Sequence, residues 1–174
     1  MASENHFFLR SNRIERVISL LCLGAPVHAQ YRQIAEAIEA HCGPEAVSFL
    51  AEPVLSHGAG DAAKTMAWYS SHEGLVVDYI ALDESAQGNA RALLRRAFEK
   101  LQPAFADEIY GETIRKCFEV PSPEDILLVG GKLVLINWGF QREQVSATPT
   151  PGVIARLLPD LPITAAAAAG IATA

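Results

Sequence analysis

The chain has 174 residues, of which half are hydrophobic and 20% are charged, and its formal net charge is −6. This length and composition predict one globular domain with a core of its own and argue against disorder throughout the chain. The acidic balance, without a basic stripe, argues against nucleic acid as a partner and against charge-driven docking on anionic lipid.

The three cysteines, Cys22, Cys42 and Cys117, lie far apart and form no CxxC pair. Separated thiols in apolar surroundings are typical of reduced, buried side chains in a cytoplasmic protein rather than of disulfides. The five histidines also lack a ligand spacing such as HxxxH. We therefore expect a cytoplasmic domain without a metal or another cofactor.

Two helices are predicted near the N-terminus. The first begins at Ser11 or Asn12, either of which can cap it, and ends at Gly24. Its apolar face recurs at helical spacing and consists of Ile14, Val17, Ile18, Leu21 and Cys22. A second stripe of the same period predicts a helix over residues 30–41.

Two strands are predicted to follow, over residues 47–55 and 64–71. Pro53 cannot donate a ladder hydrogen bond, so the first of them is expected at the edge of a sheet. In the second strand the side chains alternate, which places Trp68 on one face and Tyr69 on the other.

A long helix is predicted in the middle of the chain, after an extended segment at residues 75–80. Asp83 or Ser85 can cap this helix, and Pro103 is expected to break it. A second helical piece is predicted over residues 104–118.

The clearest local signal is the segment 126–140, which reads ILLVGGKLVLINWGF. Its two apolar, β-branched runs are joined by Gly130 and Gly131, and this pattern predicts a β-hairpin with a tight turn. Trp138 and Phe140 are expected near the end of its second strand.

These elements predict an α+β fold. We expect one small antiparallel sheet built from the two strand pairs, with the two N-terminal helices and the Pro-broken helix packed on it. The globular domain is predicted to span residues 1–144.

Residues 145–174 are predicted to be a Pro/Ala-rich linker or tail with a short amphipathic turn at 153–158. Its last ten residues are small and almost wholly apolar. They are either the start of a membrane segment that continues beyond residue 174 or a loose Ala-rich tail. Within the chain, no apolar run reaches the roughly 18 residues that a membrane span needs.

Two local patterns resemble catalytic motifs but lack their structural context. Residues 58–65 read GAGDAAKT, which differs from a phosphate-binding P-loop in having Ala63 where a glycine is required. A P-loop must also open a helix, whereas the residues that follow here have strand character. The run Ser70 to Glu73 joins a hydroxyl, an imidazole and a carboxyl, but neighbours in an extended chain point to opposite faces. We expect a hairpin loop and a polar turn.

Aromatic side chains are the strongest candidates for a functional surface. Trp68, Tyr69, Trp138 and Phe140 could line one face if both strand pairs join one sheet. Core packing is one interpretation of this set, and a partner-binding or peptide-binding groove is the other, because Trp and Tyr are favoured interface anchors.

A ligand pocket near Glu52, Trp68 and Asn137 is the alternative hypothesis. Glu52 stands between apolar residues of the predicted edge strand, where burial would raise its pKa and suit it to a chemical role. Such a site would make the protein a small-ligand or nucleotide-binding sensor, or an enzyme.

Three segments carry a family resemblance: residues 26–38, the pair 49–55 and 68–74, and residues 126–140. In order, they resemble the N-terminal region of SrfA-like proteins, a bacterial virulence-associated family encoded beside other members of the same cluster. The family's hairpin ends in a similar WGF triplet, although Gly131 precedes Lys132 here and Leu133 replaces the usual proline.

The resemblance spans roughly residues 9–142. It implies a function but assigns no catalytic residues to this chain. It implies a soluble N-terminal part followed by a Pro/Ala-rich stretch and hydrophobic anchors. We therefore expect a non-enzymatic protein-interaction domain of an envelope-linked, virulence-associated bacterial protein. Its partners would be products of neighbouring genes, and it would be cytoplasmic and tethered to the inner membrane through a segment beyond residue 174.

Overall fold

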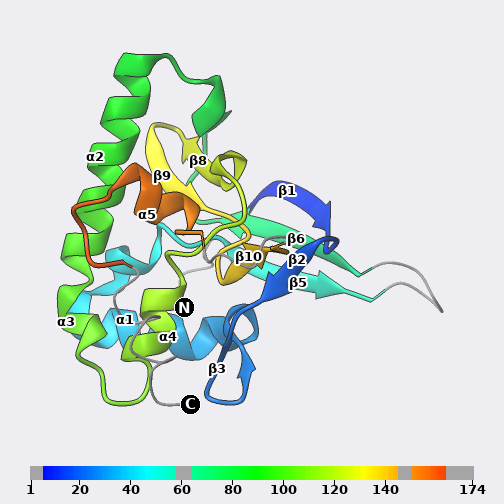
Figure 1. The fold of residues 1–174 in the computed structure, drawn as a ribbon, viewed down its shortest axis with the longest axis vertical. Helices are drawn as coiled ribbons and strands as arrows, with labels where there is room; N and C mark the ends of the chain where they lie inside the picture. Colours follow the sequence, from blue (N-terminus) through cyan, green and yellow to red (C-terminus); the bar gives the residue numbers. More distant parts are fainter. Residues whose placement is uncertain (1–5, 58–63, 145–149, 164–174) are drawn as a thin grey trace.

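Two three-stranded antiparallel sheets organise the structure, a computed structural model that describes residues 6–57, 64–144 and 150–163. The strand orders are β1 (Phe7–Arg13), β6 (Thr65–Ser70), β5 (Glu52–Ser56) in one sheet and β7 (Val76–Asp78), β8 (Ile126–Val129), β9 (Lys132–Leu135) in the other. In Figure 1 the first sheet extends to the right, and the helices gather to the left and below. The predicted α+β class is confirmed.

The first sheet contains the predicted strand pair and one strand that was not predicted. β6 lies in its centre, and burial alternates along it, with Met66, Trp68 and Ser70 facing the interior. β5 lies at the edge, as expected from Pro53. β1 pairs with the other side of β6, opposite to β5.

The predicted N-terminal helix is wrong. Instead of a helix over residues 11–24, the chain forms β1 and then three short strands, β2 (Val17–Ser19), β3 (Leu21–Cys22) and β4 (Ala25–Pro26). Arg16, Leu23 and Gly24 adopt left-handed backbone conformations with φ of 56°, 54° and 76°. Such conformations reverse the chain between strands, and the apolar spacing that mimics a helix does not reveal them.

The second predicted helix is confirmed. A 3-10 turn (Val27–Gln30) leads into α1 (Tyr31–Cys42), which buries Ile34, Ala37 and Ile38. Gln30 fixes the turn before the helix, because its Nε2 donates to the carbonyl oxygens of Cys22 at 2.8 Å and Ala25 at 3.1 Å.

The central helix begins and breaks where the sequence predicts. α2 (Glu84–Lys100) is capped by Asp83, whose carboxylate accepts a hydrogen bond from the amide of Ala86 at 2.8 Å. Pro103 stands in the first turn of the next helix, α3 (Gln102–Phe105). The second helical piece is shorter than predicted, since α4 spans only Gly111–Lys116.

The hairpin is confirmed, but it ends earlier than predicted. Gly130 and Gly131 have φ of 55° and 79°, the left-handed pair that a tight hairpin turn of this kind requires. β9 stops at Leu135, and after a turn β10 (Phe140–Arg142) pairs with β2 instead of β8. Trp138 and Phe140 therefore lie outside the second strand of the hairpin.

The two sheets are joined by one short parallel bridge and do not form the single sheet that we predicted. The amide of Leu135 donates to the carbonyl of Phe49 at 2.7 Å, and the amide of Ala51 donates to the carbonyl of Leu135 at 3.0 Å. Each predicted strand pair also gains a third strand, β1 in one sheet and β7 in the other.

Residues 150–163 belong to the core rather than to a linker. They form α5 (Val153–Leu157), and the structure buries Val153, Ile154, Leu158 and Ile163 in the same apolar cluster as the preceding domain. The predicted linker is therefore wrong for this segment. The remaining parts of the predicted tail, 145–149 and 164–174, lie outside the described residues.

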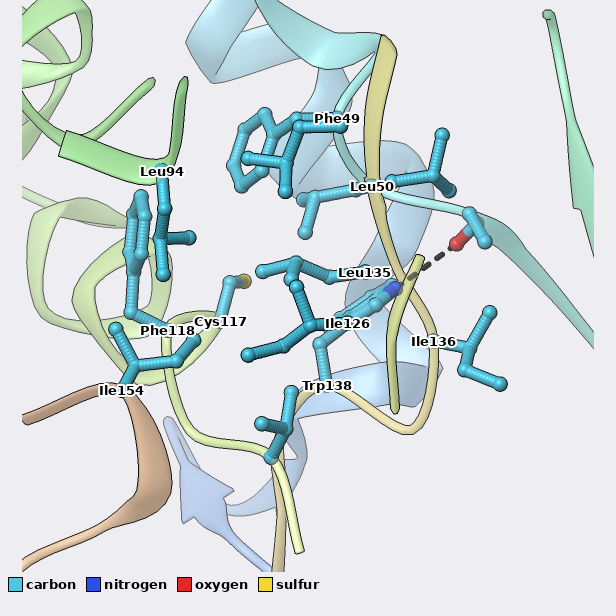
Figure 2. Close-up of a cluster of buried hydrophobic side chains, with 14 of the residues drawn as sticks. Phe49, Leu50, Leu94, Cys117, Phe118, Ile126, Leu135, Ile136, Trp138 and Ile154 are labelled. Carbon is cyan, nitrogen blue, oxygen red and sulfur yellow. Dashed lines mark hydrogen bonds between the residues drawn. The ribbon is translucent and has the colours of Figure 1, made fainter. Parts of the chain in front are cut away.

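Side chains from all parts of the chain meet in this core. Figure 2 shows Phe118 and Leu94 on one side, Leu135 and Ile126 in the middle, and Trp138 beside them. Cys117 also lies here; burial raises the pKa of its thiol, and all three cysteines are free. Within the described ranges, no helix is long and apolar enough to cross a membrane.

The two turn glycines give a matched stability test. A Cβ at Gly131 would meet nothing within 4 Å, so Gly131→Ala should cost only the left-handed strain, about 1 kcal/mol. A Cβ at Gly130 would lie 2.7 Å from the carbonyl oxygen of Glu73, so Gly130→Ala should cost roughly 3 kcal/mol. Urea unfolding measures both; equal losses would contradict the packing of the hairpin turn on residue 73.

Candidate partner-binding groove

Three of the four predicted partner-binding aromatics lie in the core. Trp68 and Trp138 are fully buried and Phe140 is 1% exposed, so none of them presents a ring to the surface. The two indole rings meet edge to face with centroids 5.9 Å apart, and Phe140 stacks on His28 at 4.6 Å. Of the two interpretations of this set, core packing holds for these three residues.

The buried indole nitrogens each find an acceptor. Trp138 Nε1 donates to the carbonyl of Ala51 at 2.9 Å, the bond drawn in Figure 2. Trp68 Nε1 is shared between two side-chain oxygens, those of Asn12 at 3.0 Å and Asn137 at 3.2 Å. Asn137 is thus a structural partner of Trp68 rather than part of an open pocket.

Asn137 also reaches a buried carboxylate. Its backbone is left-handed, with φ of 50°, and its Nδ2 donates to Asp125 Oδ1 at 2.6 Å. The other carboxylate oxygen of Asp125 accepts from the amide of Ser122 at 3.0 Å. Desolvation raises the pKa of Asp125 to about 6, although the hydrogen bond from Asn137 partly opposes this shift.

Glu52 lies away from this chain of hydrogen bonds. It stands on β5 opposite Tyr69, and its carboxylate is 2.9 Å from His6 Nδ1. Because Trp68 faces the interior and Tyr69 faces outward, Glu52 does not share a pocket with Trp68 and Asn137. The alternative ligand site therefore lacks its predicted geometry.

Tyr69 and Glu52 instead line a surface hollow between α1 and the first sheet. The hollow has a volume of about 330 Å³, and Tyr31, Ala35, Val47 and Leu50 provide apolar surface in its lining. Three carboxylates, Glu36, Glu39 and Glu52, face one guanidinium, Arg32, around it. We call this hollow the acidic half.

A second hollow of about 650 Å³ adjoins the first. Its lining brings together Lys100 from the end of α2, Lys132 from the start of β9 and His72, against one carboxylate, Glu45. Burial and the nearby charge of Lys132 lower the pKa of His72. We call this hollow the basic half.

The two hollows adjoin each other, and we call them together the groove. Pro44, Ser48 and Ser71 line both hollows and mark the ridge where they meet. The groove thus runs from α1, past the 3-10 turn η2 (Pro44–Val47), to α2 and the turn between β8 and β9.

A pair of aromatic rings, the exposed Phe8 and the half-buried Tyr69, lies at the rim of the acidic half. Phe8 on β1 is paired with Tyr69 on β6, and their rings meet edge to face with centroids 5.7 Å apart. Phe8 is 57% exposed, and Val54 on β5 is 43% exposed on the same outer face. Phe8 was not among the predicted residues, because residues 7–13 read FFLRSNR and lack the apolar–polar alternation that would predict a strand.

The two motif-like segments gain no catalytic geometry. Residues 58–63 lie outside the described part of the chain, and the residues after Lys64 form a strand, not the helix of a P-loop. In the polar turn, the amide of His72 donates to Ser70 Oγ at 2.9 Å. The described residues contain no group of three or more His, Cys, Asp or Glu side chains that could hold a metal ion.

Comparison with protein-family models, with curated proteins and with solved structures finds no match for this chain. The resemblance to SrfA-like proteins therefore stays a prediction.

Removing the Asn137 side chain should destabilise the fold. Asn137→Gly suits the left-handed backbone but leaves the carboxylate of Asp125 without its closest donor, so we expect a loss of about 2–3 kcal/mol. Asn12→Ala is the control, since Trp68 Nε1 keeps one acceptor, and should cost under about 1 kcal/mol. Urea unfolding compares the free energies of unfolding of the two variants. A larger loss for Asn12→Ala than for Asn137→Gly would contradict this prediction.

The free energy of unfolding should depend on pH through the titration of Asp125. Its pKa rises from 3.8 to about 6 on folding, so its protonated form stabilises the fold below pH 3.8, and this contribution is lost as pH rises through 6. The wild-type free energy of unfolding, relative to Asp125→Asn, should therefore fall by roughly 3 kcal/mol between pH values below 3.8 and above 6. Unfolding curves across this range test the sign, and a flat or rising difference would contradict it.

Proposed function

We propose that this chain is a non-enzymatic protein-interaction domain that holds a segment of a partner protein in the surface groove. The observation that carries the proposal is the pair formed by the exposed Phe8 and the half-buried Tyr69, beside a groove that apolar side chains help to line. Aromatic rings of this kind are the most effective anchors of protein interfaces.

The distribution of groups along the groove favours a chain molecule as its occupant. Apolar side chains line both halves, whereas charges of opposite sign lie at separate ends, on α1 and on α2 with the start of β9. A small ligand is held by a few polar groups that converge on one cavity. A peptide segment can contact both ends at once and fill the apolar surface between them.

The biological setting comes from the sequence resemblance. We propose a cytoplasmic domain of an envelope-linked, virulence-associated bacterial protein, tethered to the inner membrane through a segment beyond residue 174. The partners in this proposal are products of neighbouring genes.

The proposal is tested by measuring binding of purified neighbouring gene products to the wild type and to surface variants. Phe8→Ala and Tyr69→Ala should each weaken binding at least roughly tenfold, because each removes an anchor ring. Leu75→Ala is the matched control: Leu75 is 79% exposed and does not line the groove, so affinity should stay unchanged.

Two outcomes would overturn the proposal. One is that none of the neighbouring gene products binds, or that Phe8→Ala and Tyr69→Ala both bind with the wild-type affinity. The other is a metabolite or nucleotide that raises the melting temperature by several degrees in the wild type and not in Glu52→Ala, which would favour a ligand sensor.

A further inference from the structure

We infer that the partner segment carries a basic block and an acidic block on either side of an apolar centre, and that this charge order sets its orientation in the groove. The inference rests on the proposed function and adds the chemistry of the partner. It follows from the separation of charge between the two halves of the groove.

The acidic half offers carboxylates that the fold does not neutralise. Glu36 and Glu39 are exposed one turn apart on α1, and the described residues provide neither of them with an ion-pair partner. Like charges at this spacing repel each other on a helix. Lysine or arginine side chains of a bound segment would relieve that repulsion, and Arg32 is the only lysine or arginine among the described residues of this lining.

The basic half offers lysine ammonium groups that the fold does not neutralise either. Lys100 and Lys132 come from different elements, and among the described residues neither forms an ion pair. They share the hollow with His72 and with one opposing carboxylate, that of Glu45. An acidic block on the partner complements this end.

The middle of the groove suits apolar side chains. Val47 and Leu50 line the acidic half, and Phe49 and Leu133 line the basic half, on either side of the shared ridge. Phe49, Leu50 and Leu133 are only 6%, 4% and 7% exposed, so the core holds these side chains in place beneath the groove. A segment placed in the reverse orientation would keep its apolar contacts but set like charges against each other at both ends.

Two synthetic peptides of identical composition test the charge order. One has a lysine block, a leucine-rich centre and a glutamate block, and the other has the same residues with lysine and glutamate alternating around that centre. Fluorescence anisotropy should show the block peptide binding at least roughly tenfold more tightly, with an advantage that shrinks at high salt.

Charge reversal in the protein tests which end binds which block. Glu36→Lys with Glu39→Lys, and separately Lys100→Glu with Lys132→Glu, should each weaken the block peptide about tenfold. The variant with all four changes exchanges the two ends, so it should regain affinity for the block peptide, which then lies in the opposite orientation. Glu84→Lys with Glu108→Lys makes the same change of net charge as Glu36→Lys with Glu39→Lys, but outside the groove lining, and should leave the preference unchanged.

Thermal unfolding of each variant confirms that it folds, and the following results overturn the inference. Equal binding of both peptides, or binding of neither, rules out recognition by charge order. Sensitivity to the lysine changes alone identifies an anion site. Concentration-dependent dimerisation that Glu36→Lys with Glu39→Lys abolishes identifies a second copy as the occupant. If a gene product still binds through Phe8 and Tyr69 in any of these cases, the proposed function stands without the charge order.

Discussion

The hydrogen bonds around Asn137 hold together parts of the chain that are far apart in sequence. One amide side chain accepts from the indole of Trp68 on β6 and donates to Asp125 before β8. A neighbouring bond, from Trp138 to the carbonyl of Ala51, fixes the second indole against the first sheet. Buried polar groups are costly unless they are paired, so this arrangement stabilises only one relative placement of the two sheets. The rest of the structure depends on that placement.

The placement of the sheets also decides which residues remain for function. Along β6 the side chains alternate, so Trp68 enters the core and Tyr69 stays on the outer face. The outer face gains Phe8 from β1 and Glu52 from β5, which lie beside Tyr69 in the register of the strands. The candidate surface is therefore the reverse side of the same strand that completes the core. Its aromatic character comes from two residues, and only one of them was among the predicted set.

The groove arises where helices and hairpin meet this sheet. η2 lies between its two halves, α1 carries carboxylates on one side, and the end of α2 and the start of β9 carry lysines on the other. Although the whole chain is acidic, the fold thus gathers a small excess of positive charge at one end of the groove. Such local separation matters more for partner orientation than the net charge does, because screening limits electrostatic contacts to short distances.

Local chemistry by itself determined α1, α2 and the hairpin. Their signals, an apolar stripe, an aspartate cap and a glycine pair, act within a few residues of the chain. The α+β class followed from them. Only the tertiary structure decided that residues 11–24 are extended, because helical spacing of apolar residues does not show the left-handed turns at Arg16 and Leu23. It also decided that Trp138 is buried while Phe8 is exposed, and that Glu36 and Lys132 lie along one groove. These properties depend on contacts between segments that are distant in the sequence. Local residue patterns do not show which distant segments will pack together.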